Sequence, residues 1–355
     1  MRGSIKLFEI FGISVNIHIT FILLPLLFLI YGGFKSMVLV LIVFACVTLH
    51  ELTHSLMAKR FGIKVRDITL LPIGGVASMD KMPDSPKQEF IISIAGPMMN
   101  IVLATILFSI FYATLWIPRP ILLNPIDGNT WEHTFALVPW INVALAAFNL
   151  LPAFPMDGGR LLRSILASKM DYRRATKIAV NIGHVFAIIF AYIGFVNRHP
   201  LLILIAIFIY IAASTEGSHV NLKETLKGFR VKDILGTQFS TLDKYITISK
   251  VLELVFHIHQ EDFPVMEGDT MVGFVTRGDI IKALRKSGPN TPISDIMRTD
   301  VPVVAPEDKL LKVQHIMEEN QIKALPVVRN SLVCGVITLE DIGRLYSVMV
   351  QSRDV

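Results

Sequence analysis

Long apolar runs fill the first part of this 355-residue chain and are nearly absent from its last part. Between residues 13 and 213, several runs approach the length of about 20 residues that spans a bilayer as a helix. Beyond residue 214, apolar and charged positions alternate at the density of a water-soluble domain. The pattern predicts a multi-domain protein, with a polytopic α-helical membrane domain at 1–214 followed by a soluble α/β part.

The apolar runs divide into about six membrane-spanning helices. Arg2 and Lys6 precede the first run, which carries polar Asn16 and His18 and has no clear cleavage site. We therefore expect this run to be retained as a membrane segment rather than removed as a signal peptide. The six predicted segments are 14–31, 37–58, 89–117, 134–151, 173–195 and 200–214.

Residues 65–77, in the loop after the second predicted segment, have the pattern of a short β-hairpin. An apolar stretch leads to a break at Gly74 and Gly75, and a second apolar stretch begins at Val76. Non-helical backbone near a membrane is tolerated only where it is buried in protein or lines a wet cavity. We therefore expect a membrane-associated hairpin packed against the helices.

Composition and charge agree with a chain that is partly dissolved in lipid. The chain is 52% hydrophobic and only 18% charged, which is too apolar for an ordinary soluble enzyme. Its net charge of +5 resides mainly in short loops beside apolar runs, where lipid headgroups explain it better than nucleic acid does. We expect no nucleic-acid partner.

The distribution of basic residues predicts the orientation of the chain in the membrane. With a cytoplasmic N-terminus, the inner segments hold 14 Lys and Arg residues and the outer loops hold three. The N-terminus, the two basic loops and the soluble part are therefore predicted to be cytoplasmic, in a multi-pass protein of the cell membrane.

A His-Glu-x-x-His motif lies toward the inner end of the second predicted segment, at His50, Glu51 and His54. Residues four apart share a helix face, so both imidazoles can reach one metal ion while Glu51 takes a proton from water. A charged group inside an apolar helix costs roughly 2.5 to 3.5 kcal/mol, so this cluster indicates a polar, hydrated pocket. A pair of interfacial surface histidines stays open as the alternative on the motif alone.

A third metal ligand is expected from the end of the fourth predicted segment, because catalytic zinc usually has three protein ligands. Pro152 and Pro155 stop the helix there, and a Gly-Gly pair after Asp157 allows an irregular turn that points its carboxylate into the bundle. Asp157 and the two histidines each lie close along the chain to basic residues on the predicted cytoplasmic side. We therefore place all three at one membrane level.

These motifs together resemble the site-2 protease family of intramembrane zinc metalloproteases. The resemblance covers the second to fourth segments and rests on the His-Glu-x-x-His motif, the Gly-Gly hairpin, the stretch Ala95 to Asn100 and the motif from Asn149 to Arg160. It implies that Asp157 is the third zinc ligand, that Asn149 assists near the substrate, and that the hairpin around Gly74, Gly75 and Val76 binds substrate as an added strand. We interpret Asn100 and Asn142 as packing amides.

The expected activity is hydrolysis of a peptide bond in or near the transmembrane segment of a membrane-anchored protein substrate. One Zn²⁺ per chain activates water, and Glu51 is the general base. Asn149 is a candidate for holding the oxyanion, although a capping or packing amide is an equal alternative. Two imidazoles and a carboxylate suit several divalent ions, so iron or cobalt stays open as the metal.

The soluble part contains an internal repeat with a constant offset of 62 residues. Val231 to Ile234 corresponds to Ile293 to Ile296, and Gly273 to Asp279 corresponds to Gly335 to Asp341. Each copy has the pattern of a β-α-β-β-α module. We predict a linker at 215–229 and two repeats at 230–288 and 289–350.

Both repeats resemble CBS domains, which pair into one unit. The resemblance implies that ATP or another adenine nucleotide binds as a regulatory ligand, and it maps phosphate and ribose contacts onto Thr276, Asp279, Thr338 and Asp341. It also implies a homodimer formed through the CBS pair. A purely structural CBS pair is the alternative.

Two rival functions remain on the sequence alone. A CBS-gated transporter or channel would explain the intramembrane His and Asp as a cation pathway. It would not explain why Glu51 stands at protease spacing between the histidines. A proteolytically inactive substrate-binding protein would keep the fold, but the intact Glu51 argues against it.

Overall fold

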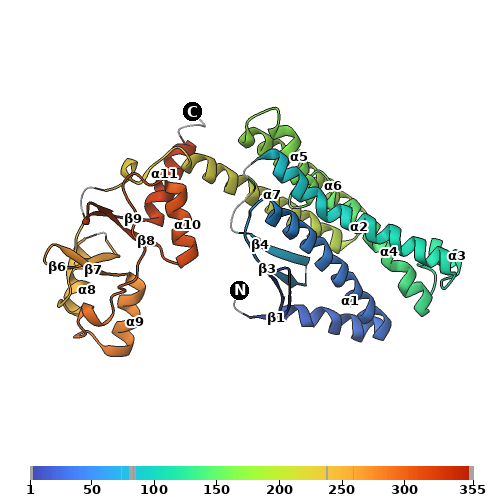
Figure 1. The fold of residues 1–355 in the computed structure, drawn as a ribbon, viewed down its shortest axis with the longest axis horizontal. Coiled ribbons are helices and arrows are strands. Elements are labelled where there is room, and N and C mark those ends of the chain that lie inside the picture. Colours follow the sequence, from blue (N-terminus) through green and yellow to red (C-terminus); the bar gives the residue numbers. More distant parts are fainter. Residues whose placement is uncertain are drawn as a thin grey trace. The chain divides into compact units, whose positions relative to one another are not determined.

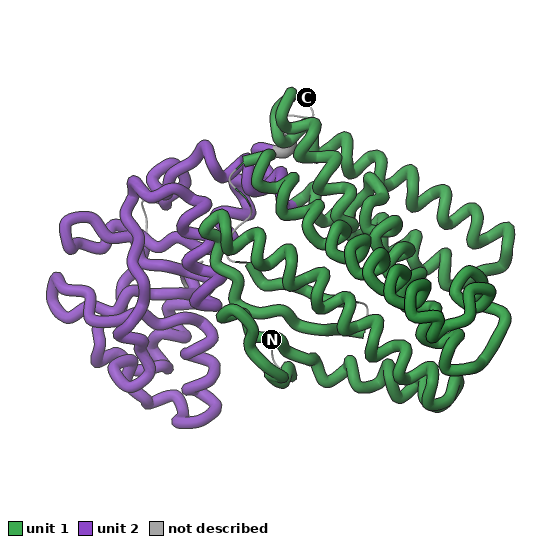
Figure 2. The backbone as a smooth tube through the Cα atoms, turned by 45° about the vertical axis from the view of Figure 1, so that its right-hand side comes forward, with its two compact units in different colours: residues 1–218 green, residues 219–355 purple. Residues whose placement is uncertain are grey.

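The computed structural model describes residues 3–72, 74–79, 83, 85–236, 239–258 and 260–351. The chain forms two compact units, residues 1–218 and residues 219–355, which Figure 2 shows in different colours. The first unit is helical with one small sheet, and the second is a repeated α/β unit. The predicted fold class is confirmed.

The helices of the first unit follow the apolar runs of the sequence (Figure 1). Their bounds are α1 Leu23–Arg60, α2 Pro86–Thr114, α3 Arg119–Leu123, α4 Trp131–Asn149, α5 Asp157–Ala167, α6 Tyr172–Val196 and α7 Pro200–Leu226, and the 3-10 helix Ile19–Ile22 leads into α1.

Helix α1 contains a sharp bend that separates two of the predicted segments. Gly33 has φ 75° and ψ −176°, a conformation that favours glycine. Figure 1 shows α1 as a bent helix. A straight helix of 38 residues would be about 57 Å long, far more than the roughly 30 Å of a bilayer core. The bend allows one continuous helix to accommodate two apolar runs.

Four stretches in the described residues are long and apolar enough to cross a membrane, judged by length and composition: Ile19–Arg60, Pro86–Thr114, Tyr172–Val196 and Pro200–Leu226. The predicted number of about six differs for two reasons. Two predicted segments lie in the single bent α1, and α4, with 19 residues, is not among the four.

The first predicted membrane segment is wrong at its start, because residues 13–18 form a strand. Strand β2, Ile13–His18, alternates apolar Ile and Val with Ser, Asn and His, a period of two that suits a half-buried strand. One apolar run covers both this strand and the helix that follows it, so hydrophobicity alone does not separate the two elements. The helix begins only after His18, whose ring nitrogen accepts a hydrogen bond from the Thr20 amide.

Strand β2 belongs to a four-stranded sheet that includes the predicted hairpin. The order is β1-β2-β3-β4, with β1–β2 and β3–β4 antiparallel and β2–β3 parallel. Strand β4 is therefore an edge strand. The remaining bounds are β1 Ser4–Ile10, β3 Val65–Leu71 and β4 Gly74–Met79.

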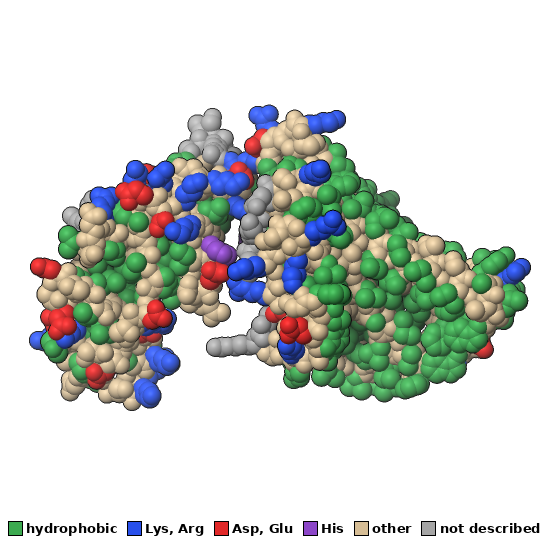
Figure 3. Space-filling view, in the orientation of Figure 1, with side chains coloured by type: hydrophobic (Ala, Val, Ile, Leu, Met, Phe, Trp, Pro, Cys, Tyr) green, Lys and Arg blue, Asp and Glu red, His purple; other side chains and the backbone are tan. Residues whose placement is uncertain are grey.

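Large apolar side chains cover much of the outer surface of the helical unit. Ile30, Tyr31, Phe195 and Leu201 are each more than half exposed. Figure 3 shows a broad hydrophobic surface on this unit, with most charged side chains of that face gathered toward one end. Contiguous apolar surface of this extent is rare on soluble monomers and fits contact with lipid.

Helix α7 continues from the last apolar run into the expected linker at 215–229 and ends at Leu226. Residues after Ser214 become polar, and this ends the hydrophobic run, but no proline interrupts the helix. The first unit ends at Ser218, while Leu226 already belongs to the buried core of the second unit.

The second unit repeats one module, as the offset in the sequence predicts. Helices α8, α9 and strand β7 each recur as α10, α11 and β9, with starting residues 62 positions later. The bounds are η2 Val231–Asp233, β5 Leu242–Asp243, α8 Ile248–His257, β6 Phe263–Glu267, β7 Thr270–Val275, α9 Arg277–Ser287, η3 Ile293–Asp295, α10 Leu310–Asn320, β8 Ala324–Arg329, β9 Leu332–Thr338 and α11 Leu339–Gln351.

Strand pairing follows the same offset. Leu242 of β5 pairs in parallel with Val265, and Val304 forms the equivalent parallel bridge with Val327. The unit buries two apolar clusters, one around Phe263 and Val275 and the other around Leu325 and Ile337. Each cluster also takes in residues from the start of the other repeat, Ile293 in the first cluster and Val231 in the second.

Candidate metal centre

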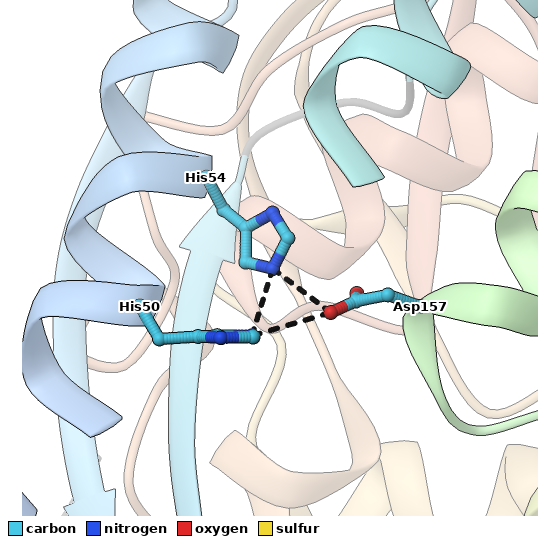
Figure 4. A group of neighbouring side chains, drawn as sticks. All are labelled: His50, His54 and Asp157. Atoms are coloured by element: carbon cyan, nitrogen blue, oxygen red, sulfur yellow. Dashed lines mark hydrogen bonds and ion pairs between the residues drawn. The ribbon is translucent and has the colours of Figure 1, made fainter. Parts of the chain in front are cut away.

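The structure brings His50, His54 and Asp157 together inside the helical unit (Figure 4). The two histidines come from α1 and the aspartate is the first residue of α5, about a hundred positions later. The Nε2 atoms of the histidines are 3.0 Å apart, and Asp157 Oδ2 lies 3.2 Å from His50 Nε2 and 3.0 Å from His54 Nε2. Both imidazoles are buried.

Hydrogen bonds on the far side of each ring fix which nitrogen carries the proton. His54 Nδ1 donates to the backbone carbonyl of Ile92 at 2.6 Å, and His50 Nδ1 lies 3.2 Å from Asn100 Oδ1. A carbonyl oxygen only accepts hydrogen bonds, so each Nδ1 holds the proton and each neutral ring turns the lone pair of Nε2 inward. Helix α2 therefore orients both imidazoles for a ligand between them.

The donor set fits a divalent cation. Two imidazole nitrogens and a carboxylate oxygen converge within about 3 Å of one another, separations that a shared proton or a bound cation would stabilise. Imidazole and carboxylate are ligand types that divalent transition metals prefer. Tetrahedral zinc, with bonds of about 2.0 to 2.2 Å, has ligand atoms roughly 3.3 to 3.6 Å apart. The observed separations are slightly shorter, so small displacements would complete the geometry.

Helix α2 approaches the histidines closely because residue 96 is glycine. A Cβ atom at Gly96 would lie 2.2 Å from His54 Nε2 and 2.6 Å from His50 Nε2. Any other residue would occupy the space between the rings. The Ala-Gly-Pro stretch of the sequence therefore keeps this side of the site open.

The turn before α5 directs Asp157 toward the histidines. Met156 is the N-cap residue and its side chain makes no capping hydrogen bond. In the described residues, the carboxylate of Asp157 contacts the two histidines rather than a first-turn amide. A Cβ at Gly158 would lie 2.2 Å from the Leu151 carbonyl oxygen. The glycine thus lets the chain fold back tightly and place Asp157 at the inner end of the turn.

Glu51 lies beside the three donors and against the edge strand β4. A Cβ atom at Gly75 would be 2.6 Å from Glu51 Cγ, so the strand backbone packs directly on this side chain. Gly74 begins β4, and Val76 is exposed. The predicted substrate-binding residues therefore form a strand edge next to the predicted general base. Asn149 is the last residue of α4 and is half-buried.

The four predicted nucleotide contacts form two helix-capping pairs in the second unit. Thr276 Oγ1 donates to Asp279 Oδ2 at 2.6 Å and accepts from the Asp279 amide, and Thr338 and Asp341 repeat this pattern. Asp279 is also bound by Arg298, at 2.7 and 3.0 Å. Within the described residues, Asp341 has no corresponding ion pair.

Three contributions to the metal centre are not predicted from the sequence: those of Gly96, Asn100 and the carbonyl of Ile92. Gly96 and Asn100 lie in the stretch that carries the resemblance, but Asn100 is interpreted there as a packing amide, although it bonds His50. A buried amide four residues after Gly96 on an apolar helix was an available signal. The carbonyl of Ile92 carries no signal in the sequence, because every residue has one.

Two protein-family models match this chain. The family model described as peptidase family M50 matches residues 38–121 and 121–190, and the CBS domain model matches residues 231–286 and 293–347. The first pair of matches contains the His-Glu-x-x-His motif and Asp157, and the second contains both Thr/Asp pairs.

Individual proteins are also similar to this chain. A zinc metalloprotease of Methanocaldococcus jannaschii is 35% identical over 98% of this chain and 98% of its own length. Stage IV sporulation protein FB of Bacillus subtilis is 26% identical over 50% of this chain and 56% of its own length. The solved site-2 protease from M. jannaschii is 41% identical, covering 60% of this chain and 95% of that one, with a TM-score of 0.45.

The fold and the site define a multi-pass membrane protein with an HExxH-type metal centre and a C-terminal CBS pair. The chain belongs to peptidase family M50 and is a zinc metalloendopeptidase of the site-2 protease type. The resemblance identified in the sequence is confirmed.

Proposed function

We propose that this chain hydrolyses a peptide bond in or near the transmembrane segment of a membrane-anchored protein, and thereby performs regulated intramembrane proteolysis. His50, His54 and Asp157 hold the zinc ion and Glu51 is the general base. The observation that carries the proposal is the convergence of three lone-pair donors in a buried site whose rings are held from behind by α2.

The residues around the donors divide the chemistry among them. A zinc ion held there would supply a Lewis acid that makes water nucleophilic near neutral pH and polarises a carbonyl. Glu51 accepts the proton of the attacking water and returns it to the leaving amine nitrogen. Asn149, at the end of α4, donates a hydrogen bond to the oxyanion.

The edge of strand β4 is the proposed binding site for substrate. A transmembrane helix hides its carbonyl groups in hydrogen bonds, so the scissile segment must be extended before attack. An extended segment added to the free edge at Gly74, Gly75 and Val76 would run past Glu51, since Gly75 packs on that side chain.

The proposed orientation has the N-terminus and the CBS pair in the cytoplasm and the metal centre toward the cytoplasmic side. The excess of basic residues in the inner segments supports it. The proposed domains are 1–214, the connection 215–229, and CBS domains at 230–288 and 289–350.

Replacement of Glu51 by Gln tests the protease mechanism. Glu51→Gln removes the base but no ligand, so we expect zinc content to stay at one per chain and cleavage to fall about a thousandfold. Purified full-length protein in detergent is assayed by mass spectrometry on single-span membrane peptides that carry a helix-breaking Gly or Pro. Glu9→Gln, an exposed carboxylate of the same unit, is the matched control.

Unchanged cleavage by Glu51→Gln would remove this residue from the mechanism. Zinc binding without any Glu51-dependent cleavage would instead favour a substrate-binding protein. A chain that moves cations but cuts no peptide would favour the transporter.

We propose also that the CBS pair binds an adenine nucleotide and modulates cleavage. The Thr/Asp pairs support this, and Asp341 is the carboxylate without an arginine partner in the described residues. Calorimetric titration of the full-length protein with ATP should give saturable binding that Asp341→Ala weakens about 10- to 100-fold, while Asp243→Asn leaves it unchanged. Absence of binding by the unmodified chain would contradict this part alone. Dimerisation through the CBS pair belongs to the same proposal, and sedimentation in detergent measures it.

A further inference from the structure

Among the described residues, Arg163 of α5 is the largest side chain that is fully buried, with 1% exposure. Arg163 is one of the 14 basic residues in the predicted inner segments. Its guanidinium nevertheless lies between two carboxylates from other helices. Its Nε donates to Glu89 of α2 at 2.8 Å, and its Nη2 also contacts Glu89. Its Nη1 donates to Glu216 of α7 at 2.6 Å.

Two aromatic rings hold the same guanidinium. The centre of the Phe154 ring is 4.9 Å from Arg163 Cζ, and that of Tyr172 is 5.0 Å away. Phe154 belongs to the turn before α5 and Tyr172 begins α6. Arg163 therefore contacts α2, the Asp157 turn, α6 and α7 at once.

Two of these contacts lead directly to the metal centre. Phe154 is three residues before Asp157, in the turn that directs this carboxylate to the histidines. Glu89 is three residues, or about 4.5 Å of helix rise, before Ile92, whose carbonyl holds His54. Arg163 thus links the elements that position two of the three zinc donors.

The third contact leads to α7, the helix through which the chain passes from the first unit to the second. Glu216 is the more exposed of the two carboxylates: 17% of its side chain is exposed, against 5% for Glu89. One guanidinium contacts two carboxylates: two of its nitrogens contact Oε1 of Glu89, and one contacts Glu216. A displacement of α7 would therefore change the Glu216 contact before the contact with Glu89.

Stability alone does not account for such a cluster. Removing charges from water costs several kcal/mol each, and apolar residues of similar volume are often as stable in place of a buried ion pair. A cluster that crosses four elements instead specifies one relative placement of their backbones.

We propose that Arg163 is a positioning residue of the metal centre and that its Glu216 contact makes zinc affinity depend on the placement of α7. This inference rests on the zinc site of the proposed function. It gives the CBS unit a physical route to the active site through the helix that the two units share.

The test measures zinc affinity rather than proteolysis. Glu216→Gln keeps the size of the side chain and one acceptor oxygen but removes its charge. Glu224→Gln is the matched control, because it makes the same change on the same helix at a carboxylate paired only with Lys227 in the described residues. Zinc dissociation constants of full-length protein in detergent are determined by competition with a chromogenic chelator, well below the melting temperature of each metal-free variant. The absorption bands of bound Co²⁺ report the ligand geometry.

We expect Glu216→Gln to raise the zinc dissociation constant about 3- to 10-fold and to shift the Co²⁺ bands, because an indirect positioning contact acts somewhat below the 10- to 100-fold range of direct outer partners. Glu224→Gln should stay within twofold of the unmodified chain. A Glu216→Gln constant within twofold of the unmodified chain overturns the inference, whatever its thermal stability, and leaves the protease proposal standing. An unmodified chain that binds no zinc overturns both.

Discussion

Asp157 in the helical unit and Asp279 in the CBS pair both stand in the first turn of a helix, yet their carboxylates serve different partners. Asp157 is the first residue of α5 and faces two imidazoles from a distant helix. Asp279 is the third residue of α9, and its carboxylate accepts from the amide and hydroxyl of Thr276 at the start of its own helix.

The two carboxylates have different partners because the aspartates occupy different positions in the first turn of their helices. A carboxylate at the third position can close a capping box with the N-cap residue, and such a pair stabilises the helix start. At the first position of α5, Met156 supplies no side-chain cap and Gly158 lets the chain fold back, so the carboxylate is free for a distant ligand. An aspartate in the first turn of a helix is therefore a stronger candidate for a metal ligand where the local cap does not use its carboxylate.

Substitution of Asp157 and substitution of Asp279 should differ most in their effect on zinc affinity. Asp157→Asn removes a charged zinc ligand, so we expect zinc affinity to fall by more than about 100-fold, the upper range for outer-shell partners, with loss of cleavage. Chelator competition on the full-length protein measures it. Asp279→Asn is the matched control and should bind zinc as the unmodified chain does.

The metal-free Asp157→Asn variant should keep its melting temperature, because this carboxylate caps no helix. Full zinc affinity in that variant would mean that another residue completes the site. A large fall in thermal stability would mean that Asp157 also supports the fold.

The sequence predicts the proximity of His50, His54 and Asp157 because each of these residues belongs to a local sequence pattern. Such a pattern can be recognised without knowledge of the tertiary structure. Four-residue spacing on an apolar helix sets the histidines, and prolines with a Gly-Gly pair set the turn at Asp157. The repeat in the second unit is equally local, since an offset of 62 residues needs no tertiary information to be seen.

The sequence does not predict the contacts between residues that lie far apart along the chain. Strand β2 was hidden in an apolar run, and its partner β3 lies some 50 residues later, so only the alternation of Ile13 to His18 could have indicated it. Arg163 carries the same signal as any basic loop residue, and its burial depends on Glu89 and Glu216 arriving from two other helices. The sequence indicates a break between two apolar runs near Gly33, but it does not indicate that one helix continues on both sides of this break.

The smallest predicted effect compares the two capping aspartates of the CBS pair. Asp279→Asn loses an ion pair with Arg298 that Asp341→Asn does not lose, so it should destabilise its helix start by about 0.5 kcal/mol more. The figure is small because 45% of the Arg298 side chain is exposed. Hydrogen exchange of the first-turn amides of α9 and α11 in the full-length protein measures the difference. Equal loss of protection in both variants would show that Arg298 adds nothing.

At acid pH, the stability that the Asp279 carboxylate gives to the start of α9 should be lost. Burial disfavours the charged form of Asp279, but hydrogen bonds from Arg298 and Thr276 outweigh burial and hold the pKa of Asp279 below its ordinary 3.8. A carboxyl group with a lowered pKa contributes stability that is present above its unfolded pKa and is lost as pH falls through the folded pKa. The excess protection of the unmodified α9 over Asp279→Asn should therefore be full at pH 7 and disappear only below about pH 3.8. A loss already complete at pH 5 would place the pKa of Asp279 above its ordinary value and contradict the role given to Arg298.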